Sequence, residues 1–460
     1  MAVLGPNTAV PSRTEVGVAG VTRKALQPAG QRSTIPFGDP ARESDVLLRA
    51  IVVARARGVG GERVEAFDAF VGESHRCSRR SRSIGDSPPA YIGLAFVFRW
   101  SYSARRHGWG VRALNYLELE GPLQRSGWAT AAAQQRQALA ATDIEVVMSP
   151  WRGGDLRSAA GSLVSGGAAF AEYDLAHCHA PGPGSLAVAR HARNQDMPLV
   201  LHAHMTAEDF GESFRFSSQI APALGRYLRW FYSQADLVLC PSQYTKGLLE
   251  DYPVDAPIRA ITNGVDRDAL AGHESLREEY RDRYDLDGTV VFAVGSVFER
   301  KGLTTFCRLA AATGHEFAWF GAYDTGPHGS PVVKRWTSDP PENVTFTGWV
   351  DDKRGAFGAG DVFCFPTKDE NQGLVVLEAM ACGKPVVISD IPVFEEFFTH
   401  GEDCLKCSSE SEFRAALDRL ADDHALRERL GTNARDTAAE HSLERVGEEL
   451  STIYREVTTA

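Results

Sequence analysis

Long apolar runs are missing from the first part of this 460-residue sequence. The two longest there, residues 46–54 and 90–98, are too short or too interrupted to cross a bilayer, which takes about 20 apolar residues. The first thirty residues also lack the apolar stretch of a secretory signal. We therefore expect a chain that does not span the membrane.

Cysteine is sparse and shows no ligand pattern. The eight residues are scattered, mostly in apolar runs, where a free thiol behaves as a small hydrophobic side chain. One C-x-x-C runs from Cys404 to Cys407, but the second pair of ligands that a zinc site needs does not follow it. We expect free thiols without a metal, and a reducing, cytoplasmic location.

Basic residues are scarce in the body of the chain. Residues 1–110 hold 16 Arg or Lys and 9 Asp or Glu, a net charge of +7, whereas the remaining 33 basic and 51 acidic residues give −18. A phosphate backbone requires a basic face, so the acidic body argues against a nucleic-acid partner.

Residues 1–110 also lack any alternation of strands and helices. They are rich in Arg, Gly, Ser and Pro, and include the basic run SHRCSRRSRSIGDSPP. One interpretation is a basic arm for anionic lipid or nucleic acid. We favour a largely disordered extension without a catalytic part, which an over-extended start of the reading frame would also produce.

From Val111 onward, apolar strand-like runs alternate with helical stretches, which predicts an α/β fold with parallel sheets. A charged linker helix is expected at residues 267–288, and a second series of strands begins at Val290. The expected strands are residues 111–119, 144–148, 173–179, 198–206, 235–242, 290–294, 317–321, 343–350 and 362–365.

The most informative stretch is residues 361–390, which predicts a buried strand, a polar loop, a short helix ended by Gly383 and a further strand. Glu370 lies in the loop, and Glu378 lies about one and a half turns inside the helix. The amides and the positive dipole at the helix start favour an anion between them. A sugar nucleotide, with phosphate in the middle and hydroxyls at both ends, fits that arrangement, whereas an isolated pair would indicate two solvated glutamates.

The enclosing run, GLVVLEAMACGKPVV, resembles the donor-binding signature of the retaining GT-B glycosyltransferases of family four, the glycosyl transferases group one. The resemblance implies that Glu370 contacts the donor sugar and that Glu378 contacts the ribose. It also implies that loop amides hold the sugar and the phosphate, namely those of Asn371, Gln372, Gly373 and Leu374.

Other segments match the same family in order. GSVFERKG places Arg300 and Lys301 at a helix start, where a cation opposes the helix dipole and needs an anionic partner. A family lysine matches Lys301, which implies contact with the donor diphosphate. The family often has a basic residue where this chain has Ser296, so either Arg300 compensates or the basic pair is incomplete. The alternative is a basic pair on the surface.

Three further residues carry over by resemblance. His204 matches a family histidine that points toward the donor sugar. Gly127 follows the first strand in a loop that approaches the donor phosphate or the acceptor, although the family often has two glycines where this chain has Ser126-Gly127. Val350 matches a segment beside the nucleotide base.

Histidines recur in two pairs, His177 with His179 and His202 with His204. Residues at i and i+2 share one face of a strand, so a metal pair is a reasonable hypothesis. The spacing fixes no carboxylate or third ligand. We therefore expect no metal, and an ordinary packed or solvated His202.

Residues 214–234 form an amphipathic stretch with basic and aromatic side chains, including Arg229 and Trp230. Such a stripe suits a membrane surface, but it is more often core plus a solvated rim. Peripheral contact with the inner face of the membrane is left open.

Taken as a whole, the resemblance covers residues 111–460. It implies a GT-B fold, with Rossmann-like domains at 111–270 and 271–440 facing across a cleft and a helix at 441–460 returning to the first. It implies transfer of a hexose-type sugar from a nucleotide-sugar donor to a hydroxyl of a lipid, glycan or small molecule, with retention and without a metal or other cofactor. The alternatives are an epimerase or phosphorylase on this plan, or a non-catalytic sugar-nucleotide-binding module.

Overall fold

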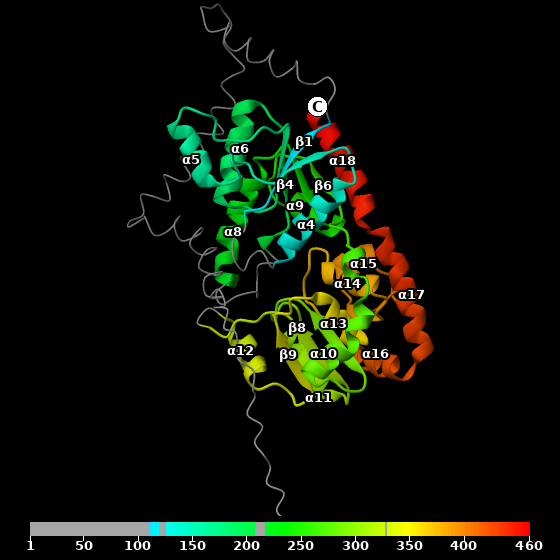
Figure 1. Ribbon diagram of the computed structural model, residues 1–460. Helices are drawn as coiled ribbons and strands as arrows, with labels where there is room; N and C mark the ends of the chain where they lie inside the picture. The colour runs from blue at the N-terminus through cyan, green and yellow to red at the C-terminus, as the bar shows by residue number, and fades with distance from the viewer. Residues whose placement is uncertain (1–109, 119–125, 208–216, 327–328) are drawn as a thin grey trace, which may run out of the picture. The chain divides into compact units, whose positions relative to one another are not determined.

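The computed structural model describes residues 110–118, 126–207, 217–326 and 329–460 (Figure 1). Apart from Gly110, the extension predicted at residues 1–110 lies outside the described residues, so its prediction is not tested.

Two six-stranded sheets form the framework, and every pairing within them is parallel. Their strand orders are β2-β1-β3-β4-β5-β6 and β12-β11-β10-β7-β8-β9, which confirms two Rossmann-like domains. The strands of the first sheet are β1 (Arg112–Tyr116), β2 (Glu145–Val147), β3 (Leu175–Cys178), β4 (Leu199–His202), β5 (Leu237–Cys240) and β6 (Ile258–Ala260). Those of the second are β7 (Val290–Val294), β8 (Glu316–Phe320), β9 (Val344–Gly348), β10 (Val362–Phe365), β11 (Val386–Ser389) and β12 (Leu405–Cys407).

The connecting helices follow the strands in order. Those of the first sheet are α4 (Gly127–Ala140), α5 (Leu156–Val164), α6 (Pro183–Gln195), α8 (Ser217–Tyr232) and α9 (Gln243–Glu250). Those that follow are α10 (Arg277–Tyr284), α11 (Leu303–Ala312), α12 (Pro331–Ser338), α13 (Lys353–Ala359), α14 (Leu374–Ala381), α15 (Pro392–Phe397), α16 (Glu410–Asp422), α17 (His424–Glu440) and α18 (Leu443–Thr459).

The prediction of one linker helix over residues 267–288 is wrong in its length. The structure has two 3-10 turns, Asp268–Leu270 and His273–Leu276, and then only the short α10. Gly272, with φ +76°, separates the turns, because a left-handed residue cannot continue a right-handed helix.

Helices cover both faces of the second sheet, which explains why its strands are continuously apolar. All five residues of β7 are buried. Phe292 packs into the apolar cluster on one face, and its neighbours Val291 and Ala293 pack into the cluster on the other.

Each sheet has one point where the strand order reverses, between β1 and β3 and between β7 and β10. In open α/β sheets, ligands bind beyond the carboxyl ends of the strands at such a point. The loop at residues 295–302 follows β7, and the loop at residues 366–373 follows β10. The fold therefore brings two of the predicted donor segments to one edge of the second sheet.

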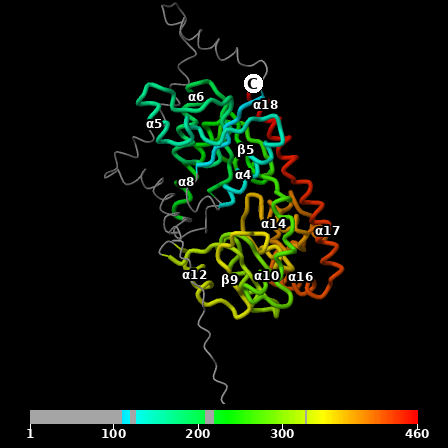
Figure 2. Tube along the Cα trace, viewed as in Figure 1, coloured from blue at the N-terminus to red at the C-terminus, as the bar shows by residue number. Residues whose placement is uncertain are grey.

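The last helix, α18, packs on α4 and on the first sheet, as predicted (Figures 1 and 2). Val446, Leu450 and Tyr454 are buried in the cluster that contains Ala113 of β1. The contact is close at Gly447, where a Cβ atom would lie 2.4 Å from the carbonyl oxygen of Ala138.

Candidate functional site

The loop between β10 and α14 is fixed by hydrogen bonds to the loop after β7. The amide of Lys368 donates to the carbonyl of Arg300 at 2.8 Å, and the Thr367 hydroxyl donates to the same oxygen at 3.3 Å. Gly302 approaches so closely that a Cβ atom there would meet the Pro366 carbonyl at 2.0 Å. The two predicted donor segments therefore form one structural unit.

Glu370 is held in this unit by Arg300. The Arg300 Nη1 atom lies 3.3 Å from Glu370 Oε1, and the two side chains are only 11% and 14% exposed. Arg300 also donates to the carbonyl of Asp369. The alternative of a basic pair on the surface thus fails for Arg300, which is mostly enclosed and paired with the predicted sugar-binding carboxylate.

Lys301 crosses the carboxyl ends of β7 and β10. Its Nζ atom lies 5.7 Å from the centre of the Phe365 ring. A Cβ atom on Gly295, where φ is +116°, would come within 3.1 Å of that Nζ. Because Gly295 has no side chain, the lysine ammonium can lie against its backbone.

Glu378 is buried in α14 and has a partner that spacing did not reveal. Lys353, at the start of α13, donates from Nζ to Glu378 Oε1 at 2.7 Å. The two residues are 25 positions apart, and only the packing of α13 beside the site brings them together. A ribose bound to Glu378 would therefore lie close to a lysine as well.

Asn371 connects this loop to the strand ends of the first sheet. Its Nδ2 atom donates to the backbone carbonyl of His204 at 3.1 Å, and its own carbonyl accepts from the Ser242 hydroxyl at 2.7 Å. The sequence predicted a role for its amide only. The structure thus brings His204 and Glu370 to the same loop.

Gln372 makes a second connection that the sequence did not reveal. Its Oε1 atom accepts from the backbone and side-chain nitrogens of Asn263, at 3.1 and 2.8 Å. Asn263 lies in the loop after β6, 109 residues before Gln372, and no local pattern in the sequence signals this contact.

His204 is buried, and its ring is held by another histidine. His204 Nε2 lies 2.9 Å from His179 Nδ1. Burial lowers the pKa of His204 to about 3, so the ring is neutral near pH 7. In this site, His204 can offer a hydrogen bond but not a positive charge.

Gly127 and Val350 lie in other elements. Gly127 is the first residue of α4, and a Cβ atom there would meet nothing within 4 Å. The preceding Ser126 is the N-cap, with its hydroxyl accepting from the Ala129 amide at 3.3 Å, which explains a serine where the family often has glycine. Val350 follows β9 and is half-buried against the core.

The C-x-x-C lies on and before β12 and holds buried thiols. Cys404 and Cys407 are free, and burial raises the pKa of the Cys407 thiol to about 12. The cysteines in the described ranges are all free and buried, as expected.

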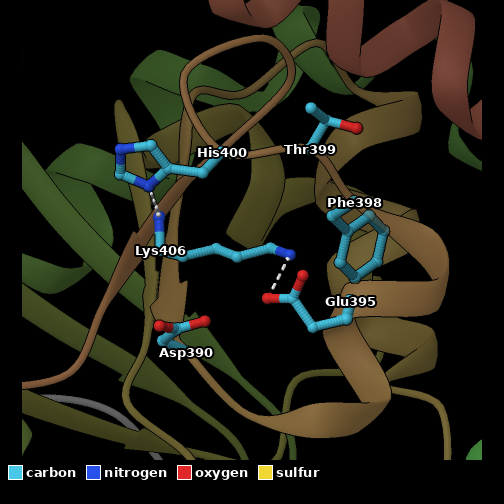
Figure 3. Close-up of a pocket in the computed structure, with 6 residues that line it drawn as sticks. All are labelled: Asp390, Glu395, Phe398, Thr399, His400 and Lys406. Carbon is cyan, nitrogen blue, oxygen red and sulfur yellow. Dashed lines mark hydrogen bonds and ion pairs between the residues drawn. The ribbon is translucent and has the colours of Figure 1, made fainter.

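A cavity of about 300 Å³ opens beside β12 (Figure 3). Lys406 spans it and donates from Nζ to Glu395 Oε1 at 2.9 Å, while its backbone amide donates to His400 Nδ1 at 3.0 Å. No predicted donor residue lines this cavity. The donor assignment therefore rests on the loops after β7 and β10.

At the end of α8, Phe231 and Tyr232 are core residues, and Trp230 is half-buried against the same apolar cluster. Phe231 and Tyr232 are each 1% exposed, so they do not form a membrane-facing stripe. Apolar side chains are exposed on α5 instead, where Leu156, Leu163 and Val164 are 64%, 63% and 89% accessible. Within the described ranges, no helix combines the length and the apolar character needed to cross a membrane.

Comparison with known proteins gives matches to both halves of the chain. The family model described as Glycosyltransferase Family 4 matches residues 126–269, and the model described as Glycosyl transferases group 1 matches residues 288–423.

The chain is 31% identical over 353 residues to processive diacylglycerol alpha-glucosyltransferase of Acholeplasma laidlawii, which covers 75% of this chain and 98% of that protein. It is 26% identical over 297 residues to alpha-D-kanosaminyltransferase of Streptomyces kanamyceticus, covering 61% and 77%. Anabaena HepE, solved in complex with UDP-glucose, superposes with a TM-score of 0.60 at 18% identity, over 75% of this chain and 100% of that one. At that identity, the likeness shows a common fold.

Proposed function

Since the chain belongs to the glycosyltransferases of family 4, glycosyl transferases group 1, we propose that it moves a hexose-type sugar from a nucleotide-sugar donor to a hydroxyl group of a membrane lipid, with retention at the anomeric carbon. The observation that carries this proposal is the Arg300–Glu370 pair in a loop that also binds the backbone of His204. We assign residues 111–270 to the acceptor side, 271–440 to the donor side and 441–460 to the crossover helix.

In the proposed complex, each part of the donor has its own contact. Glu370 accepts hydrogen bonds from hydroxyls of the sugar, and Arg300 fixes the orientation of that carboxylate. Glu378 receives the ribose. The diphosphate lies at the N-terminus of α14, where the helix dipole favours negative charge. Gly127 and Val350 complete the donor contacts.

Transfer builds negative charge on the leaving diphosphate. Lys301 and the amides of residues 371–374 are the fixed positive groups that stabilise this charge. The leaving diphosphate takes the proton of the acceptor hydroxyl, so no protein base is assigned. We accordingly propose that transfer requires no divalent metal at the diphosphate.

Two observations favour a lipid acceptor. The relative from Acholeplasma laidlawii, matched over 98% of its length, is named for a diacylglycerol acceptor. The apolar side chains exposed on α5 suit contact with a bilayer surface, where such an acceptor is presented. We therefore propose peripheral membrane contact through α5 rather than α8.

The direct test offers a panel of nucleotide sugars, beginning with UDP-glucose, to the full chain together with diacylglycerol in mixed micelles. We expect an alpha-linked glycolipid, identified by the anomeric coupling in its proton spectrum. Glu370→Ala should lower turnover at least about 100-fold, which is the scale of losing a group that acts in the transition state. Glu342→Ala, at an exposed position before β9, is the matched control and should retain full activity.

The same assay distinguishes the alternatives. An epimerase would convert the donor without an acceptor, and a phosphorylase would require a bound pyridoxal group that is visible by absorbance. A binding module would show a thermal shift with the donor but neither transfer nor hydrolysis. Transfer only to soluble sugars would reject the lipid part of the proposal.

A further inference from the structure

Four histidines gather at the carboxyl ends of β3 and β4. His177 and His179 come from one strand end, and His202 and His204 from the next; all four are buried. The rings of His177 and His179 lie 4.3 Å apart between centres, and those of His202 and His204 lie 4.0 Å apart. The sequence predicted the pairing within each strand but not the joining of the two pairs.

Three of these histidines bring a ring nitrogen each into one small region. One ring nitrogen from each of His177, His179 and His202 lies within 4.8 Å of the others. His202 Nδ1 and His177 Nε2 are 3.3 Å apart, which is long for a hydrogen bond. It matches the separation of about 3.3 Å expected for two nitrogens bound to one tetrahedral zinc ion at about 2.0–2.1 Å.

The second ring nitrogens of His177 and His179 have partners that orient these two rings. The Tyr454 hydroxyl lies 2.7 Å from His177 Nδ1, and His204 Nε2 lies 2.9 Å from His179 Nδ1. Ligating histidines commonly use their second nitrogen in this way, which fixes the tautomer that directs a lone pair at the ion. Tyr454 thus lies where the hydrogen-bond partner of a ligating histidine is expected.

Two nitrogens in the cluster lack any such partner. The Nε2 atoms of His179 and His202 are fully buried and have no hydrogen-bond partner among the described residues. Leaving a buried polar atom unsatisfied costs about 1–3 kcal/mol, so a native structure usually satisfies it. An ion bound to His179 Nε2 would satisfy that atom directly, whereas His202, whose Nδ1 is the atom near His177, would keep its Nε2 without a partner.

The protonation state of the cluster suits a metal. Burial lowers the pKa of His177 to about 3 and moves the pKa of His179 and His202 well below the usual value, with Arg136 acting in the same direction on His177 and His179. The rings are therefore neutral near pH 7, which is the form that binds metal. Arg136 also opposes a bound cation, and its Nε atom donates to Asn115 Oδ1 at 3.0 Å.

We propose that His177, His179 and His202 bind a divalent transition-metal ion of the zinc type, with a small ligand such as water in the fourth position. The ion is structural: it ties the end of β3 to the end of β4 and, through Tyr454, to α18. This inference is independent of the proposed transfer reaction, in which no metal contacts the diphosphate, and it replaces the expectation of an ordinary packed His202.

The test uses the full chain, stripped with a chelator and titrated with Co²⁺. We expect one equivalent to bind with the visible absorption of a four-coordinate site, and Zn²⁺ to displace it. His179→Asn and His202→Asn should each lose the band. His424→Asn, at an exposed position on α17, is the matched control and should keep it. Tyr454→Phe should weaken binding about 10- to 100-fold, the usual effect of losing an outer partner.

Two further measurements use the wild-type chain and need no substitution of a proposed ligand residue. Zinc added to the stripped wild-type chain should raise its thermal midpoint, because the ion binds the folded state, and elemental analysis after zinc dialysis should give about one ion per chain. A chain that holds no stoichiometric zinc and shows no cobalt band would overturn the proposal. Equal cobalt binding by His202→Asn and the His424 control would overturn it as well.

Discussion

At the scale of single residues, burial decides which charged pairs matter. Arg300 and Glu370 are almost enclosed, whereas Arg283 and Glu279, one turn apart on α10, are both exposed. Exposed pairs of that kind contribute about 0–1 kcal/mol, while breaking a buried pair costs about 3–5 kcal/mol because one charge stays behind unpaired. Removing the Glu370 carboxylate is therefore expected to cost stability, in addition to its predicted effect on sugar binding.

Lys301 is predicted to act mainly in the transition state. Lys301→Ala should lower kcat about 100-fold or more with a smaller change in KM for the donor, because the charge on the leaving group grows during transfer. Steady-state kinetics with the donor checks this. Lys334→Ala on α12 is the control, and similar rates for the two variants would remove Lys301 from the site.

Gly295 should matter for the same lysine. Gly295→Ala adds a Cβ atom 3.1 Å from Lys301 Nζ at φ +116°, so it should displace the ammonium and reduce turnover at least tenfold. Gly272→Ala is a matched control, since φ there is +76° and the new Cβ atom would meet nothing within 4 Å. Both variants should lose about 1–2 kcal/mol of stability from left-handed strain. Equal rates in the two variants would contradict the proposed position of Lys301.

At the scale of elements, the crossover helix depends on a close approach. α18 ends the chain, yet it packs on α4 near the beginning of the described part, and Gly447 allows the two backbones to meet. Its buried residues recur with helical spacing, which predicted the helix, but the surface that receives it is formed by distant residues.

Gly447→Ala should force α18 and α4 apart. The added Cβ atom would lie 2.4 Å from the Ala138 carbonyl, so we expect a loss of about 1–3 kcal/mol, the usual cost of overpacking. Thermal unfolding measures the loss. Gly161→Ala on the exposed α5, where nothing lies within 4 Å, should be neutral or slightly stabilising because alanine favours a helix. A similar midpoint for both variants would mean that the two helices can separate at little cost.

At the scale of the whole molecule, the buried histidines couple stability to pH. Their pKa values are lowered in the folded chain, to about 3 for His177 and His204, against about 6.5 in an unfolded chain. Between these values the unfolded state binds more protons, so stability is complete above about pH 6.5 and falls as the pH drops toward 3.

The expected loss is about 1 kcal/mol per histidine between about pH 7 and pH 5.5. Urea unfolding of the chelator-treated chain at these two pH values measures it. His177→Asn should show a smaller decrease in the unfolding midpoint than wild type, and His424→Asn should match wild type. If all three chains lost stability equally, the buried cluster would not be the source of the pH dependence.

Much of the architecture and of the site was predictable because its signals are local. The apolar run at β10, the polar loop and the glycine stop after α14 lie within thirty consecutive residues, and Glu370 and Arg300 could be proposed from short motifs. The contacts of Lys353 with Glu378 and of Gln372 with Asn263 were not predictable, since they join segments whose separation in sequence carries no periodic signal.

By itself, then, the sequence determined the alternating strands and helices, the start of α14 and the residue types of the loop before it, because hydrophobic periodicity and turn chemistry act over a few residues. Only the tertiary structure decided that Arg300 is buried against Glu370, that α5 rather than α8 exposes apolar side chains, and that four histidines meet. Which side chains are buried and which meet depends on the strands that become neighbours, and that strand order is a property of the whole fold.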